Sequence, residues 1–253
     1  MNFEICFPLI LNFNKQSGIR FDLLQQSDSS ILTIGKGFYY IQGENGSGKS
    51  SFLSMLALLS GSIGKKASKQ QGYIKYNNTL YNKKNFNCIK AAKIREKDFC
   101  IFTQEVFFLP GISSRRMYSI LNSSDKSISI PRSEKPNFLS GGQQQSRYMD
   151  ILFKHDKPVW FLDEPFNNLD NNNKIKFWNL IKNIKHDNNI YFLIDHSLTD
   201  YINKENSQLF ANISTTAYSS NKNDEYNISF YKIIDVHSFI DNDIHKGLHV
   251  SNS

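Results

Sequence analysis

The sequence predicts an α/β fold with a mainly parallel β-sheet, and two observations carry this prediction. Short apolar runs typical of buried strands alternate with runs of helical periodicity, which is the pattern of parallel strands joined by helices. The apolar run at 38–42 also leads directly into a glycine-rich loop, which is followed by a buried helix at 51–59. Strand, loop and helix in this order form one unit of such a fold.

The remaining elements follow from the same patterns. Further strands are expected at 3–13, 31–33, 72–76, 99–102, 159–162 and 190–194. Helices are expected at 115–122, 142–154 and 171–185. Polar turn or loop segments are expected at 61–71, 77–85 and 122–136, strands at a sheet edge at 208–217 and 226–234, and a frayed tail at 245–253.

The composition is that of a globular protein with a full core. The chain has 253 residues, of which 40% are hydrophobic and 21% charged. We interpret the net charge of +7 as a solvated lysine-rich surface. The alternatives are attraction to an anionic membrane or to nucleic acid, but there is no dense Lys/Arg block to support the latter.

Cysteine usage and hydropathy exclude several classes of protein. Cys6, Cys88 and Cys100 are widely spaced and odd in number, so neither a disulfide framework nor a cysteine metal site is predicted, which fits a reducing compartment. The first residues carry no basic side chain, and Pro8 interrupts the first apolar run, so we expect a strand rather than a signal peptide. No run is long enough for a membrane-spanning helix, so any work at a membrane would require another chain.

The glycine-rich loop has the form G-x-x-x-x-G-K-[ST], which is the phosphate-binding loop of ATP- and GTP-binding proteins. Its glycines let successive backbone N–H groups point at phosphate oxygens, beside the positive end of the helix dipole. Lys49 can reach the outer phosphates, and the Ser50 hydroxyl can ligate Mg²⁺. A flexible Gly/Ser loop is the alternative, and the strand and helix around the motif argue against it. The residues expected to bind nucleotide here are Gly43, Glu44, Asn45, Gly46, Ser47, Gly48, Lys49, Ser50 and Ser51.

The apolar strand at 159–162 delivers two carboxylates at its end. Asp163 fits a Mg²⁺ ligand, and Glu164, which points elsewhere, could orient or deprotonate an attacking water. An acidic helix cap is the common alternative, but the phosphate loop in the same chain makes it the weaker one. A second backbone anion site is predicted where two glycines follow a serine and precede a helix, at 139–143.

With these motifs on one chain, the sequence resembles the ATP-binding cassette (ABC) family, the ATPase subunits of ABC transporters. The pentapeptide at 139–143, Leu-Ser-Gly-Gly-Gln, matches the family's signature letter for letter. The resemblance covers about residues 3–200 and extends to further positions. It implies that Gln104 is the glutamine that contacts Mg²⁺ and water, that 167–170 is the D-loop, and that His196 contacts the γ-phosphate. Ser140, Gly141, Gly142, Gln143 and Asp170 join the expected nucleotide-binding residues.

The resemblance also implies the architecture. The expected fold is a single domain with a P-loop NTPase (RecA-like) core at 1–103 and 158–235, flanking antiparallel strands and a small helical subdomain at 104–157. Some positions depart from the family pattern. Ser51 stands where Thr is usual, Ser146 where Arg often follows the signature, and the usual glycine-containing strand pair after His196 is missing. Phe13 is a candidate for the aromatic residue that stacks on adenine.

The implied function is hydrolysis of ATP, with Mg²⁺, coupled to transport through a separate membrane-spanning subunit. Two cassettes, expected to be identical, would dimerise head to tail at the cytoplasmic face of a membrane, each ATP lying between one phosphate loop and the other chain's signature. The apolar segment with Phe107, Phe108 and Ile112 is expected to dock the membrane subunit. No nucleic-acid partner is expected. The alternatives are a soluble ABC-type ATPase of DNA or RNA metabolism and a regulatory module without turnover; Glu164 and His196 argue against the second.

Overall fold

A computed structural model describes residues 1–13, 16–24, 30–59, 72–82, 89–102, 157–167, 169–183, 188–203, 205–219 and 223–241, without the side chains at 180, 182, 183 and 201. The helical subdomain expected at 104–157 lies outside these residues except for its last position. The same holds for the tail at 245–253, for the expected helices at 115–122 and 142–154, and for the docking segment. These expectations therefore stay predictions.

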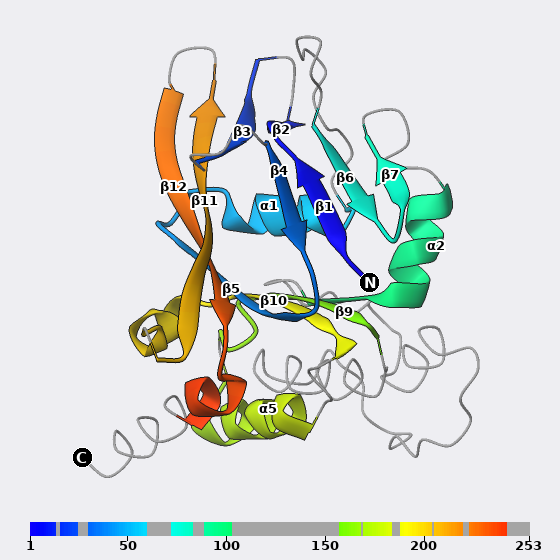
Figure 1. Ribbon diagram of the computed structural model, residues 1–253. Coiled ribbons are helices and arrows are strands. Elements are labelled where there is room, and N and C mark those ends of the chain that lie inside the picture. Colours follow the sequence, from blue (N-terminus) through cyan, green and yellow to red (C-terminus); the bar gives the residue numbers. More distant parts are fainter. Residues whose placement is uncertain are drawn as a thin grey trace, which may run out of the picture.

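In the described part of the chain the strands form an eight-stranded and a four-stranded sheet (Figure 1). The larger sheet comprises, in spatial order, β2 (Leu9–Asn12), β3 (Gly18–Leu23), β11 (Ser207–Tyr218), β12 (Asn223–Ile233), β5 (Gly37–Gly43), β10 (Ile190–Ile194), β9 (Val159–Asp163) and β8 (Phe99–Phe102). The smaller sheet comprises β4 (Ile31–Ile34), β1 (Phe3–Cys6), β6 (Tyr73–Tyr76) and β7 (Thr79–Tyr81).

The larger sheet has a parallel half and an antiparallel half. Strands β5, β10, β9 and β8 pair parallel to one another. Strands β12, β11, β3 and β2 continue the sheet from β5 with antiparallel pairing. A parallel core with flanking antiparallel strands is the fold class that the sequence predicts, and the structure confirms it.

The long hairpin β11–β12 differs from its prediction in one respect. The sequence predicts two strands at a sheet edge, but β12 pairs with β5 and β11 pairs with β3, so both lie inside the sheet. The reason is β3, a strand that the sequence analysis does not anticipate, although its apolar residues Ile19, Phe21 and Leu23 alternate with charged ones as in a half-buried strand. It covers β11, and β2 forms the edge.

The parallel strands are covered by a helix on each face. Helices α1 (Lys49–Leu56) and α5 (Asn171–Asn183) lie on opposite sides of them (Figure 1). Because successive side chains of a strand point to opposite faces, Phe161 and Phe192 pack with α1, whereas Trp160 and Tyr191 pack with α5. This explains why every residue of β9 and β10 is buried.

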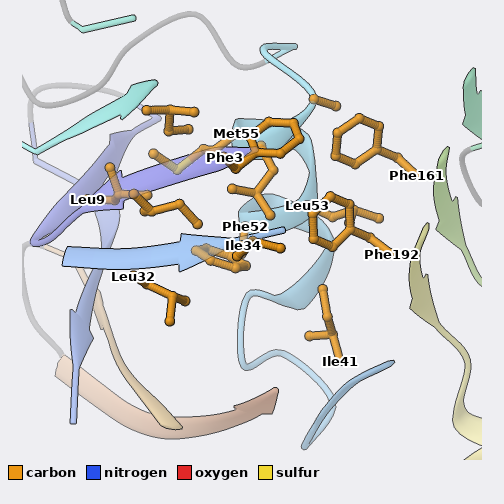
Figure 2. Packing of buried hydrophobic residues seen from close by; sticks show 14 of the residues in the cluster. Phe3, Leu9, Leu32, Ile34, Ile41, Phe52, Leu53, Met55, Phe161 and Phe192 are labelled. Carbon is orange, nitrogen blue, oxygen red and sulfur yellow. The ribbon is translucent and has the colours of Figure 1, made fainter. Parts of the chain in front are cut away.

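Helix α1 lies between the two sheets. Figure 2 shows Phe52, Leu53 and Met55 of this helix among apolar side chains of β1, β4 and the parallel strands. The apolar run expected as one strand at 3–13 is divided: β1 belongs to the smaller sheet and β2 to the larger one. Pro8 lies between them, where its missing N–H removes a hydrogen bond that a continuous strand would need.

The shorter elements complete the described structure. Asn77 and Asn78 adopt positive φ angles and turn the chain tightly from β6 into β7, within a segment expected to be irregular. Helix α2 (Ile89–Asp98), which the sequence analysis does not anticipate, precedes β8, and the 3₁₀ helix η3 (His196–Tyr201) follows β10. A helical turn at 236–241 packs on α5 through Phe239 and Trp178. None of the helices described has the length and hydropathy to span a membrane.

Candidate functional site

The candidate residues meet at the carboxyl ends of three neighbouring parallel strands. β5 ends at Gly43, β9 at Asp163, and β10 at Ile194, which pairs with Asp163. The residues that follow these strands are the phosphate loop, Glu164 and His196. In open α/β sheets this edge is where ligands bind. The structure thus brings together three of the predicted motifs, namely the phosphate loop, the Asp163–Glu164 pair and His196, although they are widely separated in the sequence.

Two glycines of the loop are required by its geometry. Gly48 has a φ of 88°, a conformation that L side chains rarely adopt, and a Cβ there would lie 3.3 Å from Ile19 of β3. At Gly43 a Cβ would lie 2.9 Å from the Asn227 carbonyl oxygen of β12 and 2.9 Å from the Ser47 hydroxyl. The antiparallel half of the sheet therefore supports the loop from outside, a role that the sequence alone does not indicate.

The loop opens directly into the N-terminus of α1. Gly48 is the cap residue, and among the described side chains none caps this helix end. The backbone N–H groups of the first turn, which includes Ser50 and Ser51, are therefore not covered by a capping side chain, and the helix dipole adds positive potential. Such a helix end, reached through a glycine-rich loop, suits an anion such as phosphate.

Lys49 places its ammonium group against the loop itself. Its Nζ donates hydrogen bonds to the carbonyl oxygens of Gly43 at 2.8 Å and Glu44 at 2.7 Å. The residue is only 6% exposed, and burial lowers the pKa of its ammonium, whereas the charges of Glu164 and Asp163 oppose that shift. A buried cation held mainly by neutral carbonyls gains from an anion in the loop.

Asp163 faces α1 because it lies on the same face of β9 as Phe161. Its Oδ1 accepts a hydrogen bond from the Ser50 hydroxyl at 3.1 Å. Burial raises the pKa of the Asp163 carboxyl to about 6, and the charge of Glu164 also raises it, while the Ser50 hydrogen bond and Lys49 lower it. The Ser50 hydroxyl and the Asp163 carboxylate are both oxygen donors, which is the type of ligand that Mg²⁺ prefers. Among the described residues, no group of three or more His, Cys, Asp or Glu side chains could hold a metal ion.

Glu164 lies beyond the end of β9 in an unusual backbone conformation. Its φ is 49°, in the left-handed region, and its N–H donates to the Ile194 carbonyl oxygen at 2.7 Å. The carboxylate accepts a hydrogen bond from Nδ2 of Asn167 at 3.3 Å. The other carboxylate oxygen lies 3.6 Å from Nε2 of His196, so the two predicted catalytic side chains face each other.

Asp170 caps α5. Its Oδ1 accepts a hydrogen bond from the Asn173 N–H at 2.8 Å, as expected for an aspartate at a helix N-terminus. Its predicted contact with a nucleotide is not tested by this geometry. Gln104 and the signature residues Ser140, Gly141, Gly142 and Gln143 lie outside the described residues, so their predicted roles also stay predictions.

Two residues at the site have no role in the sequence analysis. Asp195 is 5% exposed and bonds both the turn after Glu164 and the segment of His196. Tyr40 of β5 donates a hydrogen bond to the Asp195 carbonyl oxygen. The pattern Asp-His-Ser after a buried strand is a signal for the first, because Asp often bonds the backbone two residues on. Tyr40, inside an apolar strand, gives no local signal.

Comparison with known proteins finds a matching family and relatives of this chain. Residues 32–167 match the family described as ABC transporter. An uncharacterized ABC transporter ATP-binding protein of Methanocaldococcus jannaschii is 28% identical over 190 residues, which cover 68% of this chain and 82% of that protein. An ergothioneine transport ATP-binding protein of Helicobacter pylori is 31% identical over 167 residues, covering 60% of this chain and 74% of that protein.

Solved structures share the fold. One is the dimeric structure of an ATP-binding cassette in a post-hydrolysis state with ADP and inorganic phosphate. It aligns with a TM-score of 0.53 at 18% identity, covering 75% of this chain and 88% of that one. At this level of identity the likeness concerns the fold, including the sheet whose carboxyl edge carries the candidate residues.

Proposed function

Because the chain belongs to the ABC transporter family, as an ATP-binding subunit and ABC ATPase, we propose that the edge formed by β5, β9 and β10 is where it binds and hydrolyses ATP. One observation supports the assignment of this function to particular residues. The phosphate loop, a hydroxyl–carboxylate pair and a carboxylate–imidazole pair all lie at this one edge. Their members are Lys49, Ser50, Asp163, Glu164 and His196.

The phosphate groups bind in the loop at 43–51. The N–H groups at the start of α1 and the Lys49 ammonium supply positive potential there, and charge-assisted hydrogen bonds to phosphate are strong. Lys49 contacts two carbonyl oxygens of the same loop, so its ammonium lies beside the proposed phosphate site. Phe13, which is 60% exposed after β2, is a candidate to stack on the adenine.

The residues fit Mg²⁺ as a cofactor. Ser50 and Asp163 offer a hydroxyl and a carboxylate oxygen 3.1 Å apart, and Gln104 is proposed as a further ligand. When bound, Mg²⁺ neutralises charge on the β- and γ-phosphates. Burial raises the pKa of the Asp163 carboxyl, and this carboxyl would ligate a cation when it is ionised.

Glu164 and His196 act on the attacking water. Glu164 orients the water and accepts its proton, and His196 holds it against the γ-phosphate from the facing side. The 3.6 Å between the Nε2 of His196 and the Glu164 carboxylate brings both side chains to one point. Neighbouring Asn167 keeps the carboxylate oriented through its hydrogen bond.

We further propose a head-to-tail dimer and a membrane-spanning partner chain at the cytoplasmic face. In this arrangement Ser140, Gly141, Gly142 and Gln143 bind the γ-phosphate held by the other chain, with Asp170 nearby. The dimeric state of the related cassette supports the first part, and membership in a transporter family supports the second. The transport class of both relatives favours this function over a soluble ATPase of DNA or RNA metabolism.

Mixing two inactive chains tests the shared site. Lys49→Ala removes a phosphate ligand and Ser140→Arg blocks the signature, so each chain alone should lose turnover. A heterodimer of the two should regain one intact site, and the mixture should recover ATPase activity measured by phosphate release. A mixture that stays as inactive as its parts, although the heterodimer forms, would contradict the shared site.

Recovery of a partner from membranes tests the coupling to transport. The wild-type chain should retain a protein with several membrane spans after detergent extraction. Charged substitutions at whichever of Phe107, Phe108 and Ile112 are exposed should abolish this retention and leave the basal ATPase rate unchanged. If the wild type retains nucleic acid and no membrane protein, the transport assignment fails while ATP hydrolysis stands.

A further inference from the structure

We propose that Asp195 and Tyr40 are positioning residues, which hold the segment of Glu164, the segment of His196 and the phosphate-loop strand in register. Neither residue is a ligand or an acid–base group in the function proposed above. The inference rests on that function and adds the device that keeps its two catalytic side chains aligned. It concerns only side chains within the described ranges.

The Asp195 carboxylate joins two segments that are distant in sequence. One oxygen, Oδ2, accepts a hydrogen bond from the Phe166 N–H at 3.2 Å, in the turn that begins with Glu164. The other, Oδ1, accepts bonds from the N–H and the hydroxyl of Ser197 at 2.9 and 2.6 Å. Ser197 follows His196 directly. One carboxylate therefore bonds the chain shortly after each of the two catalytic residues, at Phe166 after Glu164 and at Ser197 after His196.

This link is strong for physical reasons. Hydrogen bonds to an ionised acceptor are roughly twice as strong as neutral ones, and a buried group that loses its partner carries a desolvation penalty. The Glu164 N–H also bonds the Ile194 carbonyl oxygen at 2.7 Å, so two bonds join the turn to the end of β10. Such support is needed because Glu164 has a positive φ of 49°.

Tyr40 attaches this assembly to the strand that leads into the phosphate loop. Its hydroxyl donates a hydrogen bond of 2.7 Å to the Asp195 carbonyl oxygen and lies 3.2 Å from the Thr199 hydroxyl. Its neighbour Tyr39 is equally buried but points to the opposite face of β5, where its hydroxyl bonds the Gly35 carbonyl oxygen. The two tyrosines are equally buried, and their hydroxyls bond different carbonyl oxygens. They therefore form a matched pair for substitution.

Steady-state ATPase kinetics of the full chain test the role of Asp195. Asp195→Ala should lower kcat by about 10²-fold, the effect of misplacing a catalytic group by about 1 Å. The KM for ATP should change less than about twofold, because the phosphate loop is untouched. Asp195→Asn, which keeps one side-chain oxygen, should recover part of kcat. Asp235→Ala is the control, because Asp235 caps the turn at 236–241 through Ser238 and follows the end of β12 that pairs with the start of β5, opposite the phosphate loop.

Tyr40→Phe and Tyr39→Phe test the attachment to the phosphate-loop strand. Each removes one hydroxyl and keeps the ring, so both chains should fold. Tyr40→Phe should lower kcat roughly 5- to 10-fold, as expected for one hydrogen bond, and Tyr39→Phe should leave it unchanged. If Asp195→Ala does not fold, this pair decides: equal kcat values for the two tyrosine variants overturn the proposal.

Amide hydrogen exchange gives a reading that does not depend on turnover. The Phe166 amide should exchange faster in Asp195→Ala than in the wild type and remain protected in Asp235→Ala. The proposal is overturned if Asp195→Ala keeps the wild-type kcat, if KM rises as much as kcat falls, or if Phe166 stays protected. A wild-type chain without ATPase activity would instead refute the proposed function, and the exchange of Phe166 would still decide whether Asp195 joins the two segments.

Discussion

The two halves of the large sheet differ in burial and in what they contribute to the site. In the parallel half, every residue of β9 and β10 is buried, and both strands deliver polar residues at their carboxyl ends. In the antiparallel half, β11 and β12 alternate between buried and more exposed positions, and none of the predicted site residues lies on β2, β3, β11 or β12. The predicted chemistry is therefore concentrated at the end of the more buried half of the sheet.

The antiparallel half contributes support instead. Ile19 of β3 and Asn227 of β12 lie against positions of the phosphate loop where only glycine fits. A rigid site needs such support, because small displacements of catalytic groups reduce rates strongly. Substitutions of site residues in the parallel half should therefore change turnover, whereas matched substitutions in the antiparallel half at positions that do not touch the phosphate loop should change stability at most.

The largest difference in turnover between the two halves is expected for a pair of glutamates, Glu164 and Glu225. Glu164→Gln should lower kcat by roughly 10²–10⁴-fold, because the amide cannot accept the proton of water, while ATP binding remains and an ATP-bound dimer accumulates. Glu225→Gln on β12 makes the same change at an exposed position of the antiparallel half and should have no effect. Phosphate release measured on both purified variants checks this. Near-normal hydrolysis by Glu164→Gln would remove the glutamate from the mechanism.

The lysines give the next contrast. Lys49→Ala should weaken ATP binding roughly 10- to 100-fold, the loss expected for charge-assisted hydrogen bonds, and should abolish turnover without unfolding the chain. Lys232→Ala on β12 removes the same charge from the antiparallel half and should leave the affinity unchanged. Titration calorimetry measures both dissociation constants. Equal affinities of Lys49→Ala and the wild type would contradict the loop's proposed role.

Substitutions of two phenylalanines, Phe192 and Phe210, test how the packing differs between the two halves of the large sheet. Phe192 of β10 is fully buried between the rings of Tyr39 and Phe161, whereas Phe210 of β11 is half-buried. Phe192→Ala should lower the free energy of unfolding by about 3–5 kcal/mol, and Phe210→Ala by about 1–2 kcal/mol. Urea denaturation of the two variants measures the difference. A larger loss at Phe210 would show that the antiparallel half carries the core.

The smallest effect on stability is expected for a substitution on the smaller sheet. Glu4 accepts hydrogen bonds from the Tyr73 hydroxyl at 2.7 Å and from Lys75 at 3.1 Å, and these interactions lower the pKa of the Glu4 carboxyl. A lowered folded-state pKa stabilises the fold above the carboxyl's ordinary pKa, and this contribution is lost as pH falls through the lowered value. Glu4→Gln should cost less than about 1 kcal/mol at neutral pH, because the pair with Lys75 is partly exposed at the surface.

Urea denaturation at several pH values checks whether folding lowers the pKa of the Glu4 carboxyl, as expected, or raises it. The difference between wild type and Glu4→Gln should shrink as the pH is lowered through the range where Glu4 is protonated. A difference that grows on acidification would contradict the lowered pKa.

Local motifs made much of the site predictable. The phosphate loop, the Asp163–Glu164 pair and His196 each follow an apolar strand, and the type and order of these residues already indicate the chemistry. Parallel strands place their carboxyl ends at one edge, so their convergence could be expected as well. Asp195 lies next to His196, but its bond to Phe166 depends on how two turns meet. No local pattern marks Tyr40, whose partner Asp195 is 155 positions away along the chain.

The sequence by itself determined the α/β class, the helix–strand alternation and the nucleotide-binding chemistry, because each depends on neighbouring residues whose spacing is read directly. The tertiary structure alone decided how the apolar run at 3–13 divides between two sheets and that β11 and β12 lie inside the larger one. It also decided which buried groups join Glu164 to His196. The physical reason is that strand pairing and buried hydrogen bonds satisfy polar groups from distant segments, and the choice among partners depends on the packing of the whole core.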